Sequence, residues 1–118
     1  MVDKINRMAF GDRLSIALEK NQTALCVGID PHISLMPELF RGSNPKEQIE
    51  KLASFSLACI EAAQDRVPAI KPQVALFEKF GPNGMEVLQR IGRAAHDAGL
   101  LVIMDAKRGD IGSTSVAY

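Results

Sequence analysis

The stretch that decides the fold is LLVIMDAKRGDIG, residues 100–112, in which an apolar run passes directly into charge. Asp105 follows the run, and Lys107 and Asp110 come after it at fixed spacing. Side chains alternate between the two faces of a strand, so Asp105 and Lys107 point the same way as alternate residues of the run. If that face looks into a barrel, the charges stand at its mouth, where barrel enzymes place their catalytic groups.

Two more short segments have the character of strands. Residues 24–29 are almost wholly apolar and stop at Asp30, a pattern typical of a strand that a parallel sheet buries on both faces. Residues 67–72 form a proline-bounded segment that contains Lys71. The third strand is expected over residues 100–105, directly after a glycine.

Helices are expected before and between these strands. An apolar stripe of helical spacing covers residues 10–21 and ends in a basic residue and an asparagine. The next helix has Asn44 as its cap, proline at the first helical position and glutamate at the third. A further helix is expected to be capped by Asn83 and to close at Gly99, and another to begin at Gly112. This alternation predicts right-handed crossovers and a parallel sheet.

The predicted fold class is α/β, as the amino-terminal part of a (β/α)₈ TIM barrel with about three of the eight strands. A complete barrel takes about 250 residues, whereas this chain has 118. Three strands of buried type would leave open sheet edges and an uncovered face. We therefore expect residues 1–118 to be the amino-terminal portion of a single barrel domain, with the remainder of the barrel absent from this chain.

Composition argues against several classes of protein. Fourteen basic residues balance fourteen acidic ones, and tryptophan is absent, so we expect neither nucleic acid nor an anionic membrane as a partner. No apolar stretch approaches the roughly 20 residues of a membrane span, and the first residues lack the apolar core of a signal peptide. Cys26 and Cys59 belong to no ligand-spaced cluster, so buried free thiols and a reducing, cytoplasmic setting are expected.

Charged residues converge at the predicted strand ends. If adjacent strands lie in register, Asp30, Lys71, Asp105 and Lys107 meet at the carboxyl end of the sheet. A D-x-K pair can also be a solvated salt bridge worth under about 1 kcal/mol, and Asp30 can simply start a turn. Lysine is seldom placed in a core-facing segment without a partner, so the four charges together favour a site.

At this point three segments closely resemble a known family. They are LCVGIDP (residues 25–31), IKPQ (70–73) and DAKRGDIGST (105–114), and they resemble orotidine 5′-phosphate decarboxylase of the longer bacterial branch. The most specific part is the D-x-K-x-x-D-I-G core. The resemblance implies a (β/α)₈ barrel that converts orotidine 5′-phosphate to uridine 5′-phosphate, the last step of de novo pyrimidine (UMP) biosynthesis. It implies no metal and no organic cofactor.

The resemblance also implies catalytic roles. An alternating charged tetrad would consist of Lys71, Asp105, Lys107 and Asp110. In it, Lys107 would donate a proton to the ring carbon that loses the carboxylate, and Asp105 would lie beside the departing carboxylate.

Substrate binding is expected from residues on several segments. Lys71 and Asp30 would hold the ribose, while Asp110 and Thr114 would reach the site of the neighbouring subunit in a homodimer. The complete set of expected substrate-binding residues is Asp30, Lys71, Asp110, Ile111 and Thr114. Gln73 and Phe77 are expected to line the pocket, and Arg108 to pair with Asp110 or contact a subunit interface.

Three alternatives stay open. A sister branch of the barrel family uses magnesium on sugar phosphates, as a decarboxylase or aldolase, but typically presents glutamate where this chain has Lys71. A Schiff-base aldolase needs a lysine among apolar neighbours, whereas Lys107 lies between carboxylates. The third alternative is a non-catalytic half-barrel that packs on a partner chain. Because barrels commonly bind phosphate after strands seven and eight, residues 1–118 alone are expected to be inactive.

Overall fold

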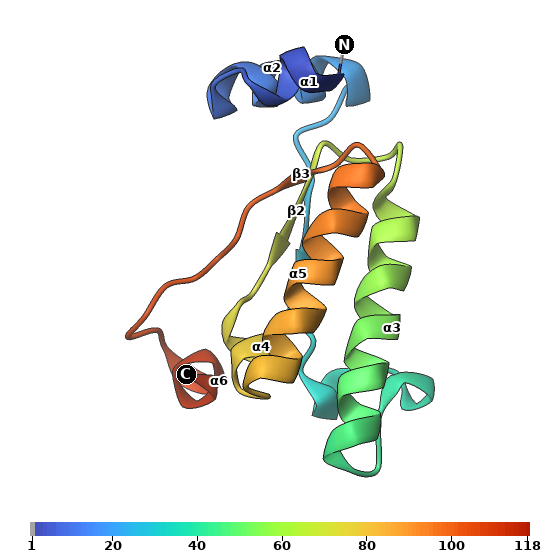
Figure 1. Cartoon of the computed structure of the whole chain (residues 1–118), viewed down its shortest axis with the longest axis vertical. Helices are drawn as coiled ribbons and strands as arrows, with labels where there is room; N and C mark the ends of the chain where they lie inside the picture. The colour runs from blue at the N-terminus through green and yellow to red at the C-terminus, as the bar shows by residue number, and fades with distance from the viewer. Residues whose placement is uncertain (1) are drawn as a thin grey trace.

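The computed structural model describes residues 2–118, in which strands and helices alternate as the sequence predicts (Figure 1). The α/β class is confirmed. In chain order the elements are α1 (Val2–Asn6), α2 (Phe10–Asn21), β1 (Cys26–Ile29), the 3₁₀ turns η1 (Ile33–Leu35) and η2 (Glu38–Phe40), α3 (Pro45–Ala63), β2 (Ala69–Pro72), α4 (Ala75–Glu78), α5 (Pro82–Asp97), β3 (Leu101–Val102) and α6 (Gly112–Ala117).

The three strands form a parallel sheet in the order β1-β2-β3. Gly28 lies opposite Lys71 on the first pair of strands, and Ala69 lies opposite Leu101 on the second. The regular part of β3 is shorter than the predicted strand over residues 100–105. Its pairing with β2 nevertheless continues as far as an isolated bridge between Gln73 and Asp105. The predicted parallel register is therefore confirmed up to the first charged residue of the decisive stretch.

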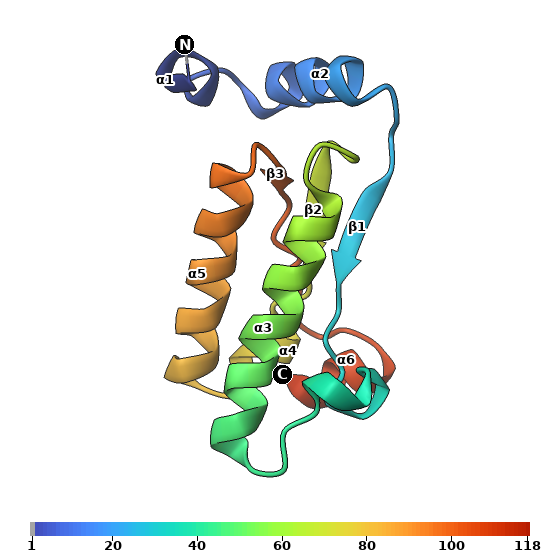
Figure 2. The same cartoon turned by 90° about the vertical axis from the view of Figure 1, so that its right-hand side faces the viewer.

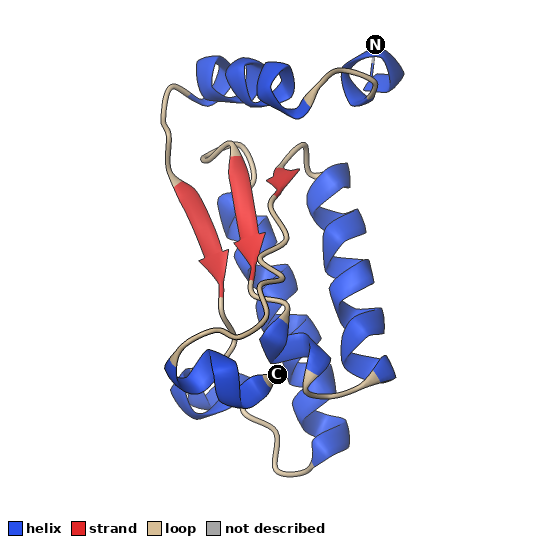
Figure 3. Cartoon of the chain, turned by 90° about the vertical axis from the view of Figure 1, so that its left-hand side faces the viewer, coloured by secondary structure: helices blue, strands red, loops and turns tan. Residues whose placement is uncertain are grey.

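Helices α3 and α5 lie side by side against one face of the sheet (Figure 2). Figure 3 shows the molecule from the other side, with the strands in front of these helices. Helix α2 crosses the end of the sheet where the strands begin, and α6 lies near the end toward which they point (Figures 1 and 3). Among the described residues, no helix combines the length and apolar character that crossing a bilayer requires.

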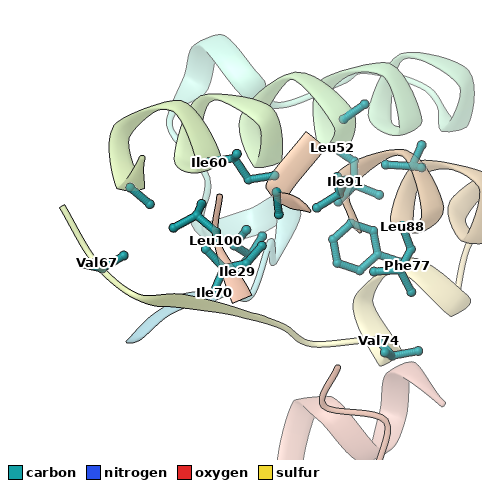
Figure 4. Close-up of a cluster of buried hydrophobic side chains, with 14 residues drawn as sticks. Ile29, Leu52, Ile60, Val67, Ile70, Val74, Phe77, Leu88, Ile91 and Leu100 are labelled. Carbon is teal, nitrogen blue, oxygen red and sulfur yellow. The ribbon is translucent and has the colours of Figure 1, made fainter. Parts of the chain in front are cut away.

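The core lies between the sheet and α3 and α5 (Figure 4). Ile29, Ile70 and Leu100 come from the strand segments, and each is at most 5% exposed. They pack with Leu52 of α3 and Ile91 of α5, which are fully buried. Full burial of one such side chain is worth about 1.5–3 kcal/mol, so this layer is what holds the helices on the sheet.

The prediction that β1 is buried on both faces is wrong. Ile29 is buried, but Cys26 and Gly28 are exposed. Cys26 and Gly28 lie on the face opposite α3 and α5, since strand residues alternate. The expectation of two buried free thiols is therefore corrected. Both cysteines are free, but Cys26 is exposed and Cys59 is only half-buried, and that burial raises the pKa of the Cys59 thiol.

The helix ends are mostly where the sequence places them. Asn44 caps α3 by accepting a hydrogen bond from the backbone N–H of Glu47 at 3.0 Å, as predicted. Helix α5, however, begins at Pro82 and not after a cap at Asn83. The reason is that Gly81 adopts φ +68°, which turns the chain sharply and leaves proline at the first helical position.

Gly84 sets how closely α5 approaches α4. A Cβ atom at Gly84 would lie 1.9 Å from the carbonyl oxygen of Phe77, whereas one at Gly92 of the same helix would make only an ordinary contact of 3.5 Å with Met104. We expect Gly84→Ala to lower the free energy of unfolding by about 1–3 kcal/mol, because the backbone must shift. We expect Gly92→Ala to raise it by about 0.5–1 kcal/mol.

Urea unfolding followed by circular dichroism measures both changes on the 118-residue chain. Equal effects of the two substitutions would contradict the close approach at Gly84.

Candidate active site

Asp105 occupies the centre of the charged cluster. Its Oδ1 atom pairs with the ammonium of Lys107, and its Oδ2 atom lies 3.4 Å from Nζ of Lys71. The Asp105 side chain is only 12% exposed, whereas Lys71 and Lys107 are 38% and 61% exposed. One nearly enclosed carboxylate thus bridges two ammonium groups that reach toward solvent.

The backbone holds Asp105 in place from both sides. Its N–H donates to the carbonyl of Pro72 at 3.1 Å, and its carbonyl accepts from the N–H of Val74 at 3.0 Å. Gln73 is the bridge partner of Asp105, and Lys71 lies two residues before Gln73. Because side chains alternate along a strand, the side chains of Lys71 and Asp105 lie on the same face of the sheet. Lys107 is two residues beyond Asp105 and reaches back to it. Strand pairing therefore brings Lys71 and Asp105 together, and Lys107 joins them from the loop beyond the last bridge.

The electrostatics of the cluster favour the ion pair. The hydrogen bond from Lys107 lowers the pKa of Asp105 below its ordinary value, against the opposing effect of burial. The same bond raises the pKa of Lys107, again against burial, and the charge of Asp110 adds to that rise. At neutral pH Asp105 is an anion and Lys107 is a cation.

The other predicted site residues lie around this centre without joining it. Asp110 is half-buried, and its Oδ1 atom accepts from the N–H of Ile111 at 2.9 Å. Its second oxygen is buried and has no hydrogen-bond partner within residues 2–118. Asp30 is exposed at the end of β1, with no side-chain hydrogen bond to the cluster in the described part of the chain. On the loop and α6, Ile111 is 84% exposed and Thr114 is half-buried.

The structure also shows the contacts of Arg108, Phe77 and Gln73, whose surroundings the sequence did not decide. Arg108 pairs with Glu78 at 3.1 Å and not with Asp110, and its guanidinium lies 4.4 Å from the ring centroid of Tyr118. Phe77 is fully buried in the core, so the expectation that it lines a pocket is wrong. Gln73 does lie at the cluster, where its Nε2 donates to Asp105 at 3.4 Å.

Sequence reasoning missed Tyr118 in this region. Its hydroxyl donates to Oε1 of Gln73 at 3.4 Å, a contact between residues 45 positions apart. No local spacing could have indicated it, because α6 folds back toward the strand ends only in three dimensions.

A cavity of about 500 Å³ lies at the opposite end of the strands, between α2 and the start of β3. Its lining includes Arg13, Ile16, His96 and Leu101 and none of the clustered charges. In barrels, that end serves stability and the carboxyl end carries the chemistry, so the candidate site is the charged cluster. Within residues 2–118, no three or more His, Cys, Asp or Glu side chains gather as a possible metal-binding group.

A parallel β/α unit with ionic groups at the carboxyl ends of its strands defines the class of (β/α)₈-barrel proteins. Comparison with known proteins makes the assignment specific. The chain belongs to the Orotidine 5′-phosphate decarboxylase / HUMPS family, whose model matches residues 23–118. The predicted family and the predicted fold, the amino-terminal part of such a barrel, are both confirmed.

The individual relatives agree with this family. The chain is 50% identical over 109 residues to an orotidine 5′-phosphate decarboxylase of Streptomyces coelicolor, covering 92% of this chain and 37% of the relative. A Streptomyces avermitilis crystal structure, provisionally assigned as the same enzyme, superposes with a TM-score of 0.73 at 47% identity, covering 89% of this chain and 35% of that one. The OMP decarboxylase structure of Leishmania donovani gives a TM-score of 0.64 at 34% identity, covering 91% and 36%.

The chain therefore spans little more than a third of the length of the curated relatives that it matches.

The ion pair predicts how stability depends on pH. The lowered pKa of Asp105 gives a stabilisation that is lost as the pH falls through that pKa, and the raised pKa of Lys107 gives one that is lost as the pH rises through it. We expect Lys107→Met to return the pKa of Asp105 toward its ordinary value. The variant's deficit in unfolding free energy is then largest at neutral pH and shrinks at both extremes.

Carbon-detected NMR of the carboxylates, with urea unfolding over a pH series, measures both effects. Lys46→Met, at an exposed position of α3, is the matched control and should change neither. A pH-independent deficit for Lys107→Met would contradict the ion pair.

Proposed function

We propose that residues 1–118 are the amino-terminal portion of a single-domain (β/α)₈ barrel that decarboxylates orotidine 5′-phosphate to uridine 5′-phosphate. The observation that carries the proposal is the carboxylate of Asp105, which bridges Lys71 and Lys107 within the D-x-K-x-x-D-I-G core. The family match and the activity named for the relatives support the same reaction. The reaction would be the last step of UMP biosynthesis, in the cytoplasm.

The chemical step needs a group that stabilises a carbanion. The bond between the ring carbon and the carboxylate breaks, carbon dioxide leaves, and the electron pair stays on the ring carbon. We assign Lys107 to place its ammonium at that carbon, stabilise the charge as it develops, and then transfer a proton to it. One carbon–carbon bond and one N–H bond of the Lys107 ammonium break, and one carbon–hydrogen bond forms, so that Lys107 is left as a neutral amine. The step involves no redox change, and the proposal includes no cofactor or metal.

The acidic neighbours keep this proton donor charged. Lys107 must stay protonated when substrate excludes water, and Asp105 raises its pKa for that purpose. In the proposal Asp105 also lies beside the substrate carboxylate, while Lys71 and Asp110 complete the alternating tetrad. Alternation keeps the cluster near neutrality, so its enclosure by substrate costs less than enclosure of a single charge.

The remaining residues are proposed to bind the nucleotide. Asp30 and Lys71 would hold the ribose from the strand ends. Asp110, Ile111 and Thr114 lie on the loop after β3 and on α6, which we propose face the site of a partner subunit in a homodimer. The exposure of Ile111 supports this proposal, because a residue that contacts a partner subunit must be accessible in the single chain.

Two enzymatic alternatives fit the cluster less well. A magnesium-dependent sugar-phosphate enzyme needs oxygen ligands, but Lys71 places an ammonium directly beside Asp105. A Schiff-base aldolase needs a neutral, nucleophilic amine, whereas the contact with Asp105 raises the pKa of Lys107. A proton donor is the role that a strongly protonated lysine can serve.

The reaction is tested on a chain in which residues 1–118 are joined to the remaining part of the Streptomyces coelicolor relative. We expect decarboxylation that persists in EDTA, measured by the loss of orotidine absorbance. Lys107→Ala should lower kcat about a thousandfold, because it removes both the charge and the proton. Lys46→Ala should have no effect. Strict dependence on magnesium would favour the sister branch.

The 118-residue chain by itself should not turn over. Phosphate sites of barrels commonly follow strands seven and eight, which lie outside residues 1–118 in the proposed arrangement. We expect no decarboxylation and weak binding of uridine 5′-phosphate, measured by calorimetry on the purified chain. If the 118-residue chain turned over substrate faster than its Lys107→Ala variant, the proposal that part of the site lies outside residues 1–118 would be contradicted.

A further inference from the structure

We propose that Gln73 is a positioning residue that fixes the orientation of the Asp105 carboxylate, and that Tyr118 in turn fixes Gln73. This inference rests on the proposed function, in which Asp105 must face both Lys107 and the substrate.

Gln73 lies where a positioning group must lie. It is the bridge partner of Asp105, one residue beyond the end of β2, and its side chain is buried, with the residue 5% exposed. Its Nε2 atom donates to Oδ2 of Asp105 at 3.4 Å, and its Oε1 atom accepts from the hydroxyl of Tyr118 at 3.4 Å. Both ends of the amide are therefore engaged. A flipped amide would set its oxygen against the carboxylate, which has no proton to donate.

The contacts divide the two oxygens of Asp105. Oδ1 contacts Lys107, whereas Oδ2 contacts Lys71 and Gln73. An ammonium is a compact charge on a flexible stem, so two lysines alone hold a carboxylate in many orientations. A buried amide has a fixed plane and adds no charge. Gln73 thus fixes the orientation of the Asp105 carboxylate, while the two lysines attract it electrostatically.

Tyr118 has anchors of its own. The Arg108 guanidinium lies over its ring at 4.4 Å and pairs with Glu78 of α4 at 3.1 Å. A continuous chain of contacts then runs from α4 through Arg108, Tyr118 and Gln73 to Asp105. These contacts connect the loop after β3 and helix α6 to the strand ends. The position of α6 therefore affects the carboxylate of Asp105 through the side-chain amide of Gln73.

The test uses the chain joined to the remaining part of the Streptomyces coelicolor relative. Gln73→Met keeps the length of the side chain and removes both hydrogen bonds, and Gln89→Met makes the same change at an exposed position of α5. We expect Gln73→Met to lower kcat about ten- to a hundredfold, as loss of an orienting partner does, and to change KM less than threefold. Tyr118→Phe should give a smaller loss of kcat in the same direction. Gln89→Met should leave both constants unchanged.

A second measurement is independent of turnover. NMR titration should show a higher pKa for Asp105 in Gln73→Met than in the parent, since a hydrogen bond to the charged form is lost. The charged and titratable groups around this carboxylate and amide are the same in both chains: Lys71, Lys107, Asp110, Arg108, Glu78, Tyr118 and, at the end of β1, Asp30.

Gln73→Glu adds a third measurement. At neutral pH it places a second negative charge beside Asp105, and at lower pH it regains a neutral donor. We therefore expect its activity relative to the parent to recover as the pH falls, which a purely structural defect would not produce.

The outcomes separate this inference from the proposed function. An inactive parent chain would overturn the proposed function, and the pKa of Asp105 would still test the contact with Gln73. An active parent with unchanged kcat and unchanged pKa in Gln73→Met would overturn the inference. A fall in kcat matched by an equal effect of Gln89→Met would overturn it as well.

Discussion

The bridge that the Asp105 carboxylate makes between two ammonium groups is the interaction on which the site depends. A carboxylate so nearly enclosed is costly unless it is paired, and the two lysines supply the pairing from different segments. The converse also holds, because Lys71 and Lys107 would repel each other without the acid between them. The charge of Asp105 is tolerated because of the two lysines, and it in turn offsets their mutual repulsion.

The fold places this unit through strand alternation. Ile29 and Ile70 face the helices and form the hydrophobic layer, while Gly28 and Lys71, their chain neighbours, face the other way. One sheet therefore separates the hydrophobic core from the charged cluster, with apolar contacts on one face and charge on the other. The same division explains why Cys26 is exposed in a strand whose composition is almost wholly apolar.

Much of this could be predicted from the sequence, because it follows from local rules. The cap at Asn44, the parallel pairing of the strands and the meeting of Asp105 with its two lysines follow from spacing. Asp30, which the spacing also predicts in this group, does not join it. Helix α4 could not be predicted, since four residues are too few to show a helical period. The start of α5 depends on the left-handed backbone of Gly81, and the contact of Gln73 with Tyr118 depends on how α6 folds back. Such features are decided by tertiary packing.

Because Asp105 bridges Gln73, the contacts of the charged cluster depend on the register in which β3 pairs with β2. Hydrophobic alternation repeats every two residues, so a two-residue slip of β3 along β2 would keep the apolar side chains facing the helices. The core would tolerate the pattern of a slip in either direction. A slip toward the carboxyl end of β2 would carry Asp105 about 7 Å along the strand and away from Lys71, and the opposite slip would take Asp105 away from Gln73, its bridge partner. Electrostatic complementarity thus distinguishes between alignments that hydrophobic burial treats as equivalent, and the groups assigned to chemistry also help to select the native pairing.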